Sequence, residues 1–349
     1  MKKIVLVCLL TVLAAYFVSG CKNGLENTKY KIIYSKNETD SEKVEQQKEK
    51  SYTIAIIPKV GGIPYFNEAE IGAMEAAKQL NVEVFFEGPD VADSEQQIRI
   101  IEEFIEKRVD VIAVSANDPE DLLPVLNRAR NENIKVITWD ADTLPEAREF
   151  FINMVHPETL GRHIMDTLAW NTGEEGDYII MTASLTAANL SEWMHWMLVQ
   201  QEEFYPQLNL IDVAETGEDP GEAYIQSLKM LDKYPDLKGI IGNGSIIAPS
   251  AAQAVREKNK SGEVAVVGLS PPTSMREFLK DGSAQVATLW SPKRLGYLTV
   301  VLAEQLLQGK YPEDWQDVPG VGIIRVMDDV VIMGEPIDFT AENVDQYDF

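Results

Sequence analysis

The fold is decided by the stretch from residue 52 to residue 139, which begins YTIAIIP (52–58) and ends KVITW (135–139). Four short runs rich in β-branched residues are predicted as strands: Tyr52–Pro58, Val82–Phe86, Val109–Ser115 and Lys135–Trp139. Apolar residues at helical spacing predict three helices between them: Asn67–Leu80, Gln96–Lys107 and Pro119–Asn131. Strands that alternate with helices form parallel βαβ units, because a parallel connection needs a crossover long enough for a helix. We therefore predict an α/β lobe built on an open parallel sheet.

A second series of the same kind follows after residue 150. Its predicted strands are Tyr178–Thr182, Leu208–Thr216, Gly239–Gly242 and Val264–Leu269. Its predicted helices lie at about 158–171, 191–204, 221–233 and 247–258. The predicted fold class is therefore α/β with two Rossmann-like open parallel-sheet lobes.

The first 50 residues have a different character. Lys2 and Lys3 precede an apolar run over residues 4–18, and small residues then lead to Cys21. This layout predicts a signal peptide over residues 1–20. The alternative, an uncut anchor, is disfavoured because the apolar run is shorter than the roughly 20 residues that span a bilayer. VSGC (18–21) resembles the bacterial lipobox, which implies a lipid on Cys21. The polar residues 21–50 are predicted to be a flexible tether.

The composition excludes several classes of function. The chain of 349 residues has 31 Lys and Arg against 56 Asp and Glu, a net charge of −25, which argues against binding nucleic acid. Both cysteines lie in the first 21 residues, so the folded body has neither a disulfide framework nor a cysteine nucleophile. His156, His163 and His195 lack metal-ligand spacing, and the motifs GxGxxG, GxxxxGK[ST] and GxSxG are absent. We expect no metal and no cofactor.

Polar residues follow the predicted strands where each strand ends. In open α/β sheets ligands bind beyond the carboxyl ends of the strands. Lys59 follows the first strand, Asn117 lies in the loop after the third, and Asp140 ends the fourth. Asn243 and Ser245 follow a strand of the second series. Hydrogen-bonding side chains at these positions suit a small polyhydroxylated ligand.

The order of several motifs resembles one known family. These motifs are IAIIPKVGGIPYF (54–66), GPDVADSEQQI (88–98), VSANDP (114–119), VITWDADT (136–143), YPDLKGII (234–241), VVGLSPP (266–272), DVPGVG (317–322) and ENVDQYDF (342–349). Together they resemble the type I periplasmic binding proteins for sugars. Within that family the sequence is most similar to the Lsr-type receptors for autoinducer-2, and next to the rhamnose-binding proteins.

The resemblance implies a two-lobed clamshell that closes on one sugar-like molecule and delivers it to an ABC permease. Three hinge strands would join the lobes, and we expect them near 140–142, 285–292 and 312–320. The N-terminal lobe would then combine 51–140 with 292–310, and the C-terminal lobe 141–291 with 311–349. The implied protein is monomeric, lies outside the cytoplasmic membrane and touches it only through the lipid.

The resemblance also assigns site residues in the first lobe. Lys59 in the IPK motif would donate to ligand oxygens, and a surface lysine is the alternative. Asp140 would accept hydrogen bonds from sugar hydroxyls, and its alternative is a hinge cap. Tyr65 and Phe66 would pack on the ring of the sugar and Trp290, at the second hinge, would form an opposite wall, or all three would only be core aromatics. Asn117 either contacts the ligand or shapes the loop, and its neighbour Asp118 is predicted to cap the helix that starts at Pro119.

The second lobe departs from the Lsr-type pattern. An alignment on Trp193 places Asn189 and Leu190 where those receptors have an Asp-Gln pair, and Asn243 and Ser245 where they have Pro and Ala. Asn189 can still hydrogen-bond, whereas Leu190 cannot. Sites built for hydroxyls discriminate strongly through such contacts, so autoinducer-2, rhamnose and a pentose all stay open as ligands.

Two other functions are compatible with the fold. The chain would be a sensory receptor if its closed form were presented to a chemoreceptor or a histidine kinase rather than to a permease. A lipid-anchored carbohydrate hydrolase is the more distant alternative, because no catalytic constellation is visible. Acidic pairs such as Asp140 and Asp142 are common by chance in so acidic a chain.

Overall fold

The computed structural model describes residues 51–349. The predicted signal peptide (1–20), the lipidation site Cys21 and the tether (21–50) lie outside the described residues. Within residues 51–349, no helix combines the length and the apolar character that a membrane span requires.

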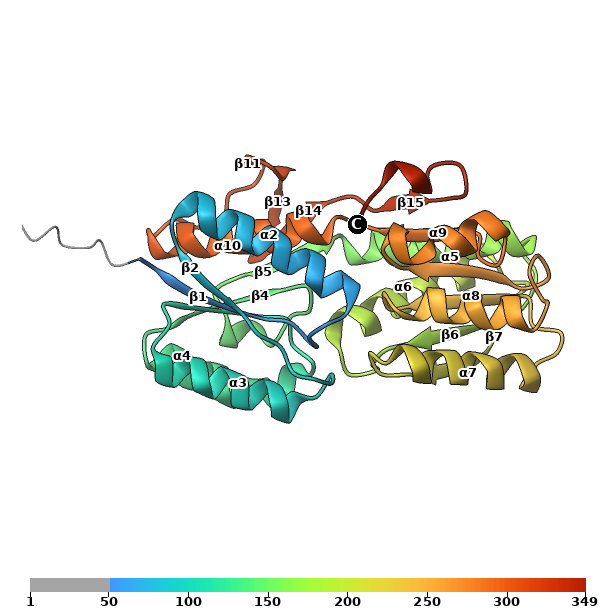
Figure 1. Ribbon diagram of the computed structural model, residues 1–349, viewed down its shortest axis with the longest axis horizontal. Helices are drawn as coiled ribbons and strands as arrows, with labels where there is room; N and C mark the ends of the chain where they lie inside the picture. Colours follow the sequence, from blue (N-terminus) through green and yellow to red (C-terminus); the bar gives the residue numbers. More distant parts are fainter. Residues whose placement is uncertain (1–50) are drawn as a thin grey trace, which may run out of the picture. The chain divides into compact units, whose positions relative to one another are not determined.

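The first lobe contains a seven-stranded sheet in the order β13-β14-β5-β4-β3-β1-β2 (Figure 1). All neighbouring strands pair in parallel except β13 with β14. The elements of this lobe are β1 (Thr53–Ile57), α2 (Pro64–Leu80), β2 (Glu83–Phe86), α3 (Ser94–Lys107), β3 (Val111–Val114), α4 (Pro119–Asn131), β4 (Lys135–Trp139), the 3-10 helix η1 (Pro145–Ala147), β5 (Phe151–Val155), α10 (Pro292–Leu307), β11 (Asp317–Val318), β12 (Gly322–Ile323), β13 (Arg325–Met327) and β14 (Val330–Gly334).

The second lobe contains a six-stranded sheet in the order β15-β10-β9-β8-β6-β7, and only β15 runs antiparallel to its neighbour. Helix α5 packs against α6, and α7 against α8. The elements are α5 (Pro157–Thr172), β6 (Gly176–Thr182), α6 (Ala188–Phe204), β7 (Leu208–Glu215), α7 (Pro220–Lys233), β8 (Gly239–Asn243), α8 (Ile247–Glu257), β9 (Ala265–Leu269), α9 (Pro272–Asp281), β10 (Val286–Leu289), β15 (Ile337–Phe339) and the 3-10 helix η2 (Val344–Gln346). The predicted fold class is confirmed.

Strand β1 shows why an almost continuous apolar run forms the centre of a sheet. Successive side chains of a strand point to opposite faces. Ile54 and Ile56 belong to the cluster under α2 and α10, whereas Ala55 and Ile57 belong to the cluster under α3 and α4. Figure 1 shows these two helix pairs on opposite sides of the sheet. Both faces of the strand are therefore buried, as in other parallel sheets.

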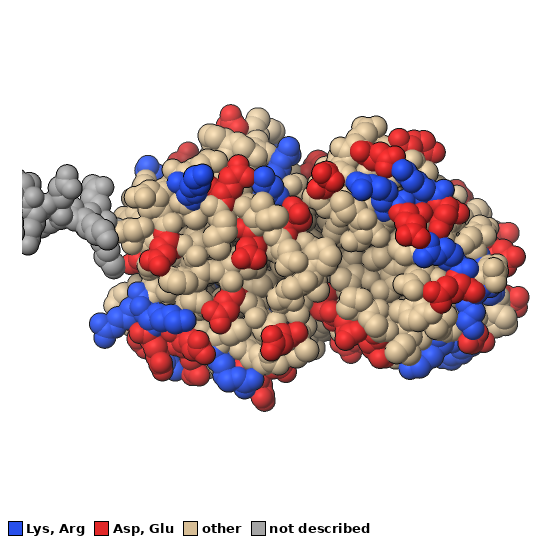
Figure 2. All heavy atoms as spheres, viewed as in Figure 1, with Lys and Arg blue, Asp and Glu red and all other residues tan. Residues whose placement is uncertain are grey.

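The acidic surface carries no basic patch on the face shown in Figure 2. Lys and Arg side chains there are interspersed with Asp and Glu over both lobes. This distribution agrees with the net charge of −25 and gives this face no surface suited to nucleic acid.

Two of the three crossings between the lobes differ from the predicted positions. We expected the first near 140–142, but β5 continues the first sheet, paired with β4 and β14, so the chain crosses after Val155. We expected the third near 312–320, but β13 and β14 also belong to the first sheet, and the crossing lies between Gly334 and Ile337. The second lies between β10 and α10. The first lobe is therefore 51–155 with 292–334, and the second is 156–291 with 335–349.

The last crossing is fixed to the second lobe by a hydrogen-bonded acid. Asp338 on β15 accepts hydrogen bonds from His163 Nε2 at 2.8 Å and from Thr288 Oγ1 at 2.7 Å. The hydrogen bond to Asp338 raises the pKa of His163. Burial favours the neutral form of Asp338, but the hydrogen bonds from His163 and Thr288 outweigh it and lower the pKa of Asp338. Helix α5 is thus tied to β15 by a pH-dependent pair.

The pair of His163 and Asp338 is predicted to contribute to the free energy of unfolding by an amount that depends on pH. Because the pKa of His163 is raised in the folded state, its contribution is complete below about pH 6.5 and is lost as the pH rises through that raised value. We expect His163→Gln to lower the free energy of unfolding by about 0.5–1 kcal/mol at pH 5.5, and by less at pH 9. Urea unfolding at both pH values measures it. The exposed His195 provides the control variant His195→Gln, and a His163 difference that stays constant with pH would contradict the prediction.

Helices α2 and α10 pack with their backbones in contact. A Cβ at Gly72 would lie 1.8 Å from the carbonyl oxygen of Lys293, and a Cβ at Gly296 would lie 1.9 Å from that of Ala69. Helix α2 begins with Pro64 and Tyr65, and α10 begins directly after Trp290 and Ser291. This close contact therefore sets the distance between two of the aromatic residues predicted for the site.

The contact reverses the usual effect of alanine in a helix. Alanine favours helices over glycine by about 1 kcal/mol, but Gly296→Ala forces the two backbones apart. We expect it to lower the free energy of unfolding by about 1–3 kcal/mol in urea titrations. Gly334→Ala is the matched control, because no atom lies within 4 Å of its added Cβ. Equal stability of the two variants would rule out the close contact.

Candidate functional site

The polar residues that follow β1, β3 and β4 converge at one edge of the first sheet. These strands are neighbours and parallel, so their carboxyl ends lie side by side. Lys59, Ser115 and Asp140 follow them in turn. All three residues are buried, at 3%, 0% and 4% exposure. Buried polar groups need partners, and the partners show how the site is built.

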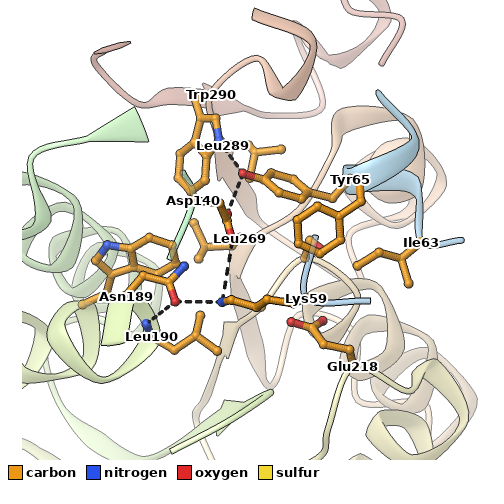
Figure 3. Close-up of a pocket in the computed structure, with 14 residues that line it drawn as sticks. Lys59, Ile63, Tyr65, Asp140, Asn189, Leu190, Glu218, Leu269, Leu289 and Trp290 are labelled. Carbon is orange, nitrogen blue, oxygen red and sulfur yellow. Dashed lines mark hydrogen bonds and ion pairs between the residues drawn. The ribbon is translucent and has the colours of Figure 1, made fainter. Parts of the chain in front are cut away.

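Lys59 connects the two lobes. Its Nζ donates to Asn189 Oδ1 of the second lobe at 2.8 Å and lies 3.7 Å from Asp140 Oδ2 of the first (Figure 3). An ammonium group is costly to bury unless it is paired and hydrogen-bonded. The lysine therefore holds the beginning of α6 against the carboxyl edge of the first sheet.

Asp140 is the acceptor of a hydrogen-bonded chain. Its Oδ1 accepts from Tyr65 Oη at 2.9 Å and its Oδ2 from Ser115 Oγ at 2.6 Å. Tyr65 Oη in turn accepts from Trp290 Nε1 at 3.0 Å. Asp140 adopts the left-handed conformation (φ +62°), which Asn and Asp tolerate better than most residues. Burial raises the pKa of Tyr65 well above its ordinary value, and the charge of Asp140 raises it further.

Aromatic rings form one wall of the pocket. The ring centres of Tyr65 and Trp290 lie 6.1 Å apart, edge to face, and those of Trp193 and Trp290 lie 5.7 Å apart. Phe66 lies 5.0 Å from Tyr65 and 5.8 Å from Trp139. This wall gives a ligand with an apolar face a surface to pack on, in the same pocket as the polar groups of Lys59 and Asp140.

Gln97 on α3 fixes the loops that carry these groups. It is fully buried, and its Nε2 donates to the carbonyl oxygens of Pro58 at 3.0 Å and Ser115 at 2.7 Å. Its Oε1 accepts from the backbone N–H of Asn117 at 2.9 Å. One amide thus satisfies three backbone groups of the loops after β1 and β3, directly beside Lys59.

The structure brings most of the predicted site residues together and sets two apart. The predicted residues that line one pocket are Lys59, Tyr65, Phe66, Asp140, Asn189, Ser245 and Trp290. Asn117 lines an adjoining cavity that shares Lys59, Leu190 and Glu218 with this pocket, and Asn243 is not among the lining residues. Asn117 Nδ2 donates to the carbonyl oxygen of Lys59 at 2.9 Å, and Asn243 Nδ2 to that of Leu190 at 3.0 Å. Both asparagines hold the backbone of residues that do reach the pocket. Asp118 caps α4 as predicted, with its Oδ1 accepting from two backbone N–H groups.

Several residues of the pocket were not anticipated. They are Ile63, Trp193, Glu218, Gly244, Leu269 and Leu289, together with Leu190, which was noted only as a lost polar contact. Glu218 follows β7, so the rule that ligands lie beyond carboxyl strand ends points to it as it does to Asp140. Trp193 was used only to align the sequence.

Comparison with known proteins identifies the family. The model of the periplasmic binding protein domain matches residues 54–311. This chain belongs to the periplasmic binding protein family. The expectation drawn from the sequence motifs is thereby confirmed, and with it the assignment to a family of solute-binding proteins.

Two solved structures are similar over nearly their whole length. One is an ABC transporter solute-binding protein from Clostridium phytofermentas with bound L-rhamnose (28% identical, TM-score 0.81, covering 85% of this chain and 98% of that one). Another is LsrB from Clostridium saccharobutylicum in complex with AI-2 (25%, TM-score 0.80, 85% and 100%). The D-ribose/D-allose-binding protein of Pseudomonas aeruginosa is 25% identical over 272 residues, 76% of this chain and 85% of that protein.

The role of Gln97 leads to a prediction about stability. Gln97→Leu leaves two buried carbonyl oxygens and one N–H group without their partner, so we expect the free energy of unfolding to fall by about 2–4 kcal/mol. Urea unfolding followed by circular dichroism measures it. Gln96→Leu is the matched control, because Gln96 is only partly buried and its side chain accepts a single bond, from the N–H of Asp90. Similar losses in the two variants would exclude the role assigned to Gln97.

Proposed function

We propose that this chain is the extracytoplasmic solute-binding component of an ABC importer for a small sugar or an autoinducer-2-like furanose. The observation that carries the proposal is the contact of Lys59 with Asp140 on one lobe and Asn189 on the other. These three groups face one pocket together with the aromatic wall. A hydroxylated ligand between them has donors and acceptors available from both lobes, and apolar ring surface beside them.

The mechanism is a shift between open and closed arrangements of the lobes. A ligand stabilises the closed form only to the extent that it binds that form more tightly. Lys59, Asp140 and Tyr65 belong to the first lobe, whereas Asn189 and Ser245 belong to the second. A ligand bound by both sets is complete only in the closed form, which is then the form presented to the permease.

The proposed ligand class has two sources of support. Of the related proteins named above, one has bound L-rhamnose, one is in complex with AI-2, and one is a D-ribose/D-allose-binding protein. In this chain the pocket retains a lysine and an aspartate able to bind hydroxyls, while Leu190 and Ser245 make its second-lobe side distinct. We propose Lys59, Asp140, Asn189 and Ser245 as polar ligand contacts. The aromatic contacts proposed are Tyr65, Phe66 and Trp290.

We further propose that the protein acts as a monomer held at the membrane by a lipid on Cys21. VSGC (18–21) at the end of the predicted signal peptide supports the lipid. The tether 21–50 would then let the two lobes reach the permease. Mass spectrometry of the protein purified from membranes tests this: an N-terminal lipid-modified Cys21 is expected, and an unmodified residue 21 or an intact signal peptide would contradict it.

Asp140→Asn tests the proposed site. Asparagine keeps the shape and tolerates the left-handed backbone, but it removes the charge that strengthens hydrogen bonds from hydroxyls. The probes are L-rhamnose, autoinducer-2, D-ribose and D-allose, measured by isothermal titration calorimetry. We expect the wild type to bind at least one of them, and Asp140→Asn to lose about 2 kcal/mol of binding free energy.

Asp121→Asn is the control, because Asp121 lies on the exposed first turn of α4. Its affinity is expected to match the wild type. Binding of every sugar by Asp140→Asn with wild-type affinity would exclude Asp140 as a ligand contact, and a wild type that binds none of the four probes would contradict the proposed ligand class.

A further inference from the structure

Glu218 places a second carboxylate at the pocket, on the opposite lobe from Asp140. It follows β7 and precedes Asp219, whose side chain caps α7 by accepting from the N–H of Glu222 at 2.9 Å. The cap fixes the backbone beside Glu218. In Figure 3 the carboxylate of Glu218 lies beside the side chain of Lys59. Glu218 lines the same pocket as Lys59, Asp140 and Trp290.

The second-lobe side of the pocket holds polar atoms without partners. Among residues 51–349, Glu218 Oε2 and Trp193 Nε1 are buried and have no hydrogen-bond partner. Both residues line the pocket. Burying a polar atom without a partner is costly, so such atoms are rare unless something else satisfies them. Glu218 Oε2 is a hydrogen-bond acceptor, and Trp193 Nε1 is a donor.

The first-lobe side is different, because its groups already have protein partners. Both oxygens of Asp140 accept hydroxyl hydrogens, from Tyr65 and from Ser115, and Lys59 donates to Asn189. A ligand on the first lobe would share these groups with their protein partners, since an ammonium group has three donors and each carboxylate oxygen can accept a second hydrogen bond. A ligand that meets Glu218 and Trp193 makes bonds that the protein alone does not.

The electrostatic surroundings of Glu218 agree with this difference between the two sides of the pocket. Burial raises the pKa of Glu218, the nearby Lys59 lowers it, and the charge of Asp140 raises it again. Burial therefore disfavours the charged form of this carboxylate. A hydrogen bond to a charged carboxylate is stronger than one between neutral groups. Hydroxyl groups are the simplest ligand groups able both to donate to Glu218 and to accept from Trp193.

We propose that Glu218 and Trp193 form a second-lobe subsite that selects the ligand, with Glu218 Oε2 accepting from a ligand hydroxyl and Trp193 Nε1 donating to a ligand oxygen. This inference rests on the proposed function, because it assigns the ligand contacts that Leu190 does not make. The subsite belongs to one lobe alone, so it adds binding energy when the second lobe closes on the ligand.

The test combines Glu218→Gln and Trp193→Phe with the four probes L-rhamnose, autoinducer-2, D-ribose and D-allose, measured by calorimetry. Glu218→Gln keeps the shape and removes the charge, and we expect its affinity to fall at least about tenfold. Trp193→Phe keeps an aromatic ring and removes the donor, and we expect a fall of about fivefold. The controls are Glu222→Gln, the same change in the first turn of α7, and Trp170→Phe at an exposed tryptophan.

The melting temperature without ligand separates a ligand contact from a structural role. Because the Glu218 charge is buried without a hydrogen bond at Oε2, Glu218→Gln is expected to melt at the wild-type temperature or above it. A residue that held the fold together would show the reverse. A Glu218→Gln protein that melts lower and binds as before would overturn the proposal.

Monodeoxy analogues of the probe that binds most tightly identify the contact itself. In the wild type, one analogue should bind about tenfold more weakly than its parent sugar, and in Glu218→Gln that penalty should shrink to about twofold. Equal penalties in the two proteins, for every analogue, would overturn the assignment of Glu218 as a ligand contact. Failure of the wild type to bind any probe would instead overturn the proposed function, so the two failures are distinguishable.

Discussion

A positive charge buried between two lobes sets the conditions for the rest of this structure. Lys59 is 3% exposed, so its ammonium group needs an opposite charge or hydrogen-bond partners in the interior. Asp140 balances its charge from the same lobe, and Asn189 accepts its hydrogen bond from the other. The contacts of Lys59 with both lobes meet this need. The loop that holds Lys59 is in turn fixed by the buried amides of Gln97 and Asn117, which donate to the carbonyl oxygens of Pro58 and Lys59.

The pocket has two sides with different chemical states. On the first lobe, hydroxyl groups of Tyr65 and Ser115 already occupy the carboxylate of Asp140. On the second lobe, Glu218 and Trp193 keep polar atoms without partners. Among the residues that line the pocket, those with a polar atom that has no protein partner therefore both lie on the second lobe.

Several features were predictable because they depend on local sequence. The strands near 52–58, 109–115 and 135–139 are short apolar runs with strong β preference, and Asp118 before Pro119 is a local capping signal. The rule that ligands lie beyond the carboxyl ends of strands placed Lys59 and Asp140 at one edge of the first sheet. In the structure, Lys59 Nζ lies 3.7 Å from Asp140 Oδ2. The same rule, applied to the end of β7, points to Glu218.

The crossings between lobes were not predictable in the same way. Strand β5 pairs with β4, the strand before it in the chain, and with β14, whose residues lie about 180 positions later. No local pattern encodes the pairing with β14, so residues 141–155 were assigned to the other lobe. For Asn117 and Asn243 the local sequence left the partners of the amide groups open, and only the fold shows that their nitrogens donate to backbone carbonyl oxygens.

The sequence by itself determined the α/β class, the two series of strands and helices, and the residue types at the carboxyl ends of the strands, because these follow from periodicity and composition. Only the tertiary structure decided which of those residues meet. Helices α2 and α10 approach closely enough at Gly72 and Gly296 to bring Tyr65 to Trp290, and the lobes meet so that Lys59 reaches Asn189. Contacts between residues more than 100 positions apart depend on packing and desolvation across the whole fold, which no single segment of the chain specifies.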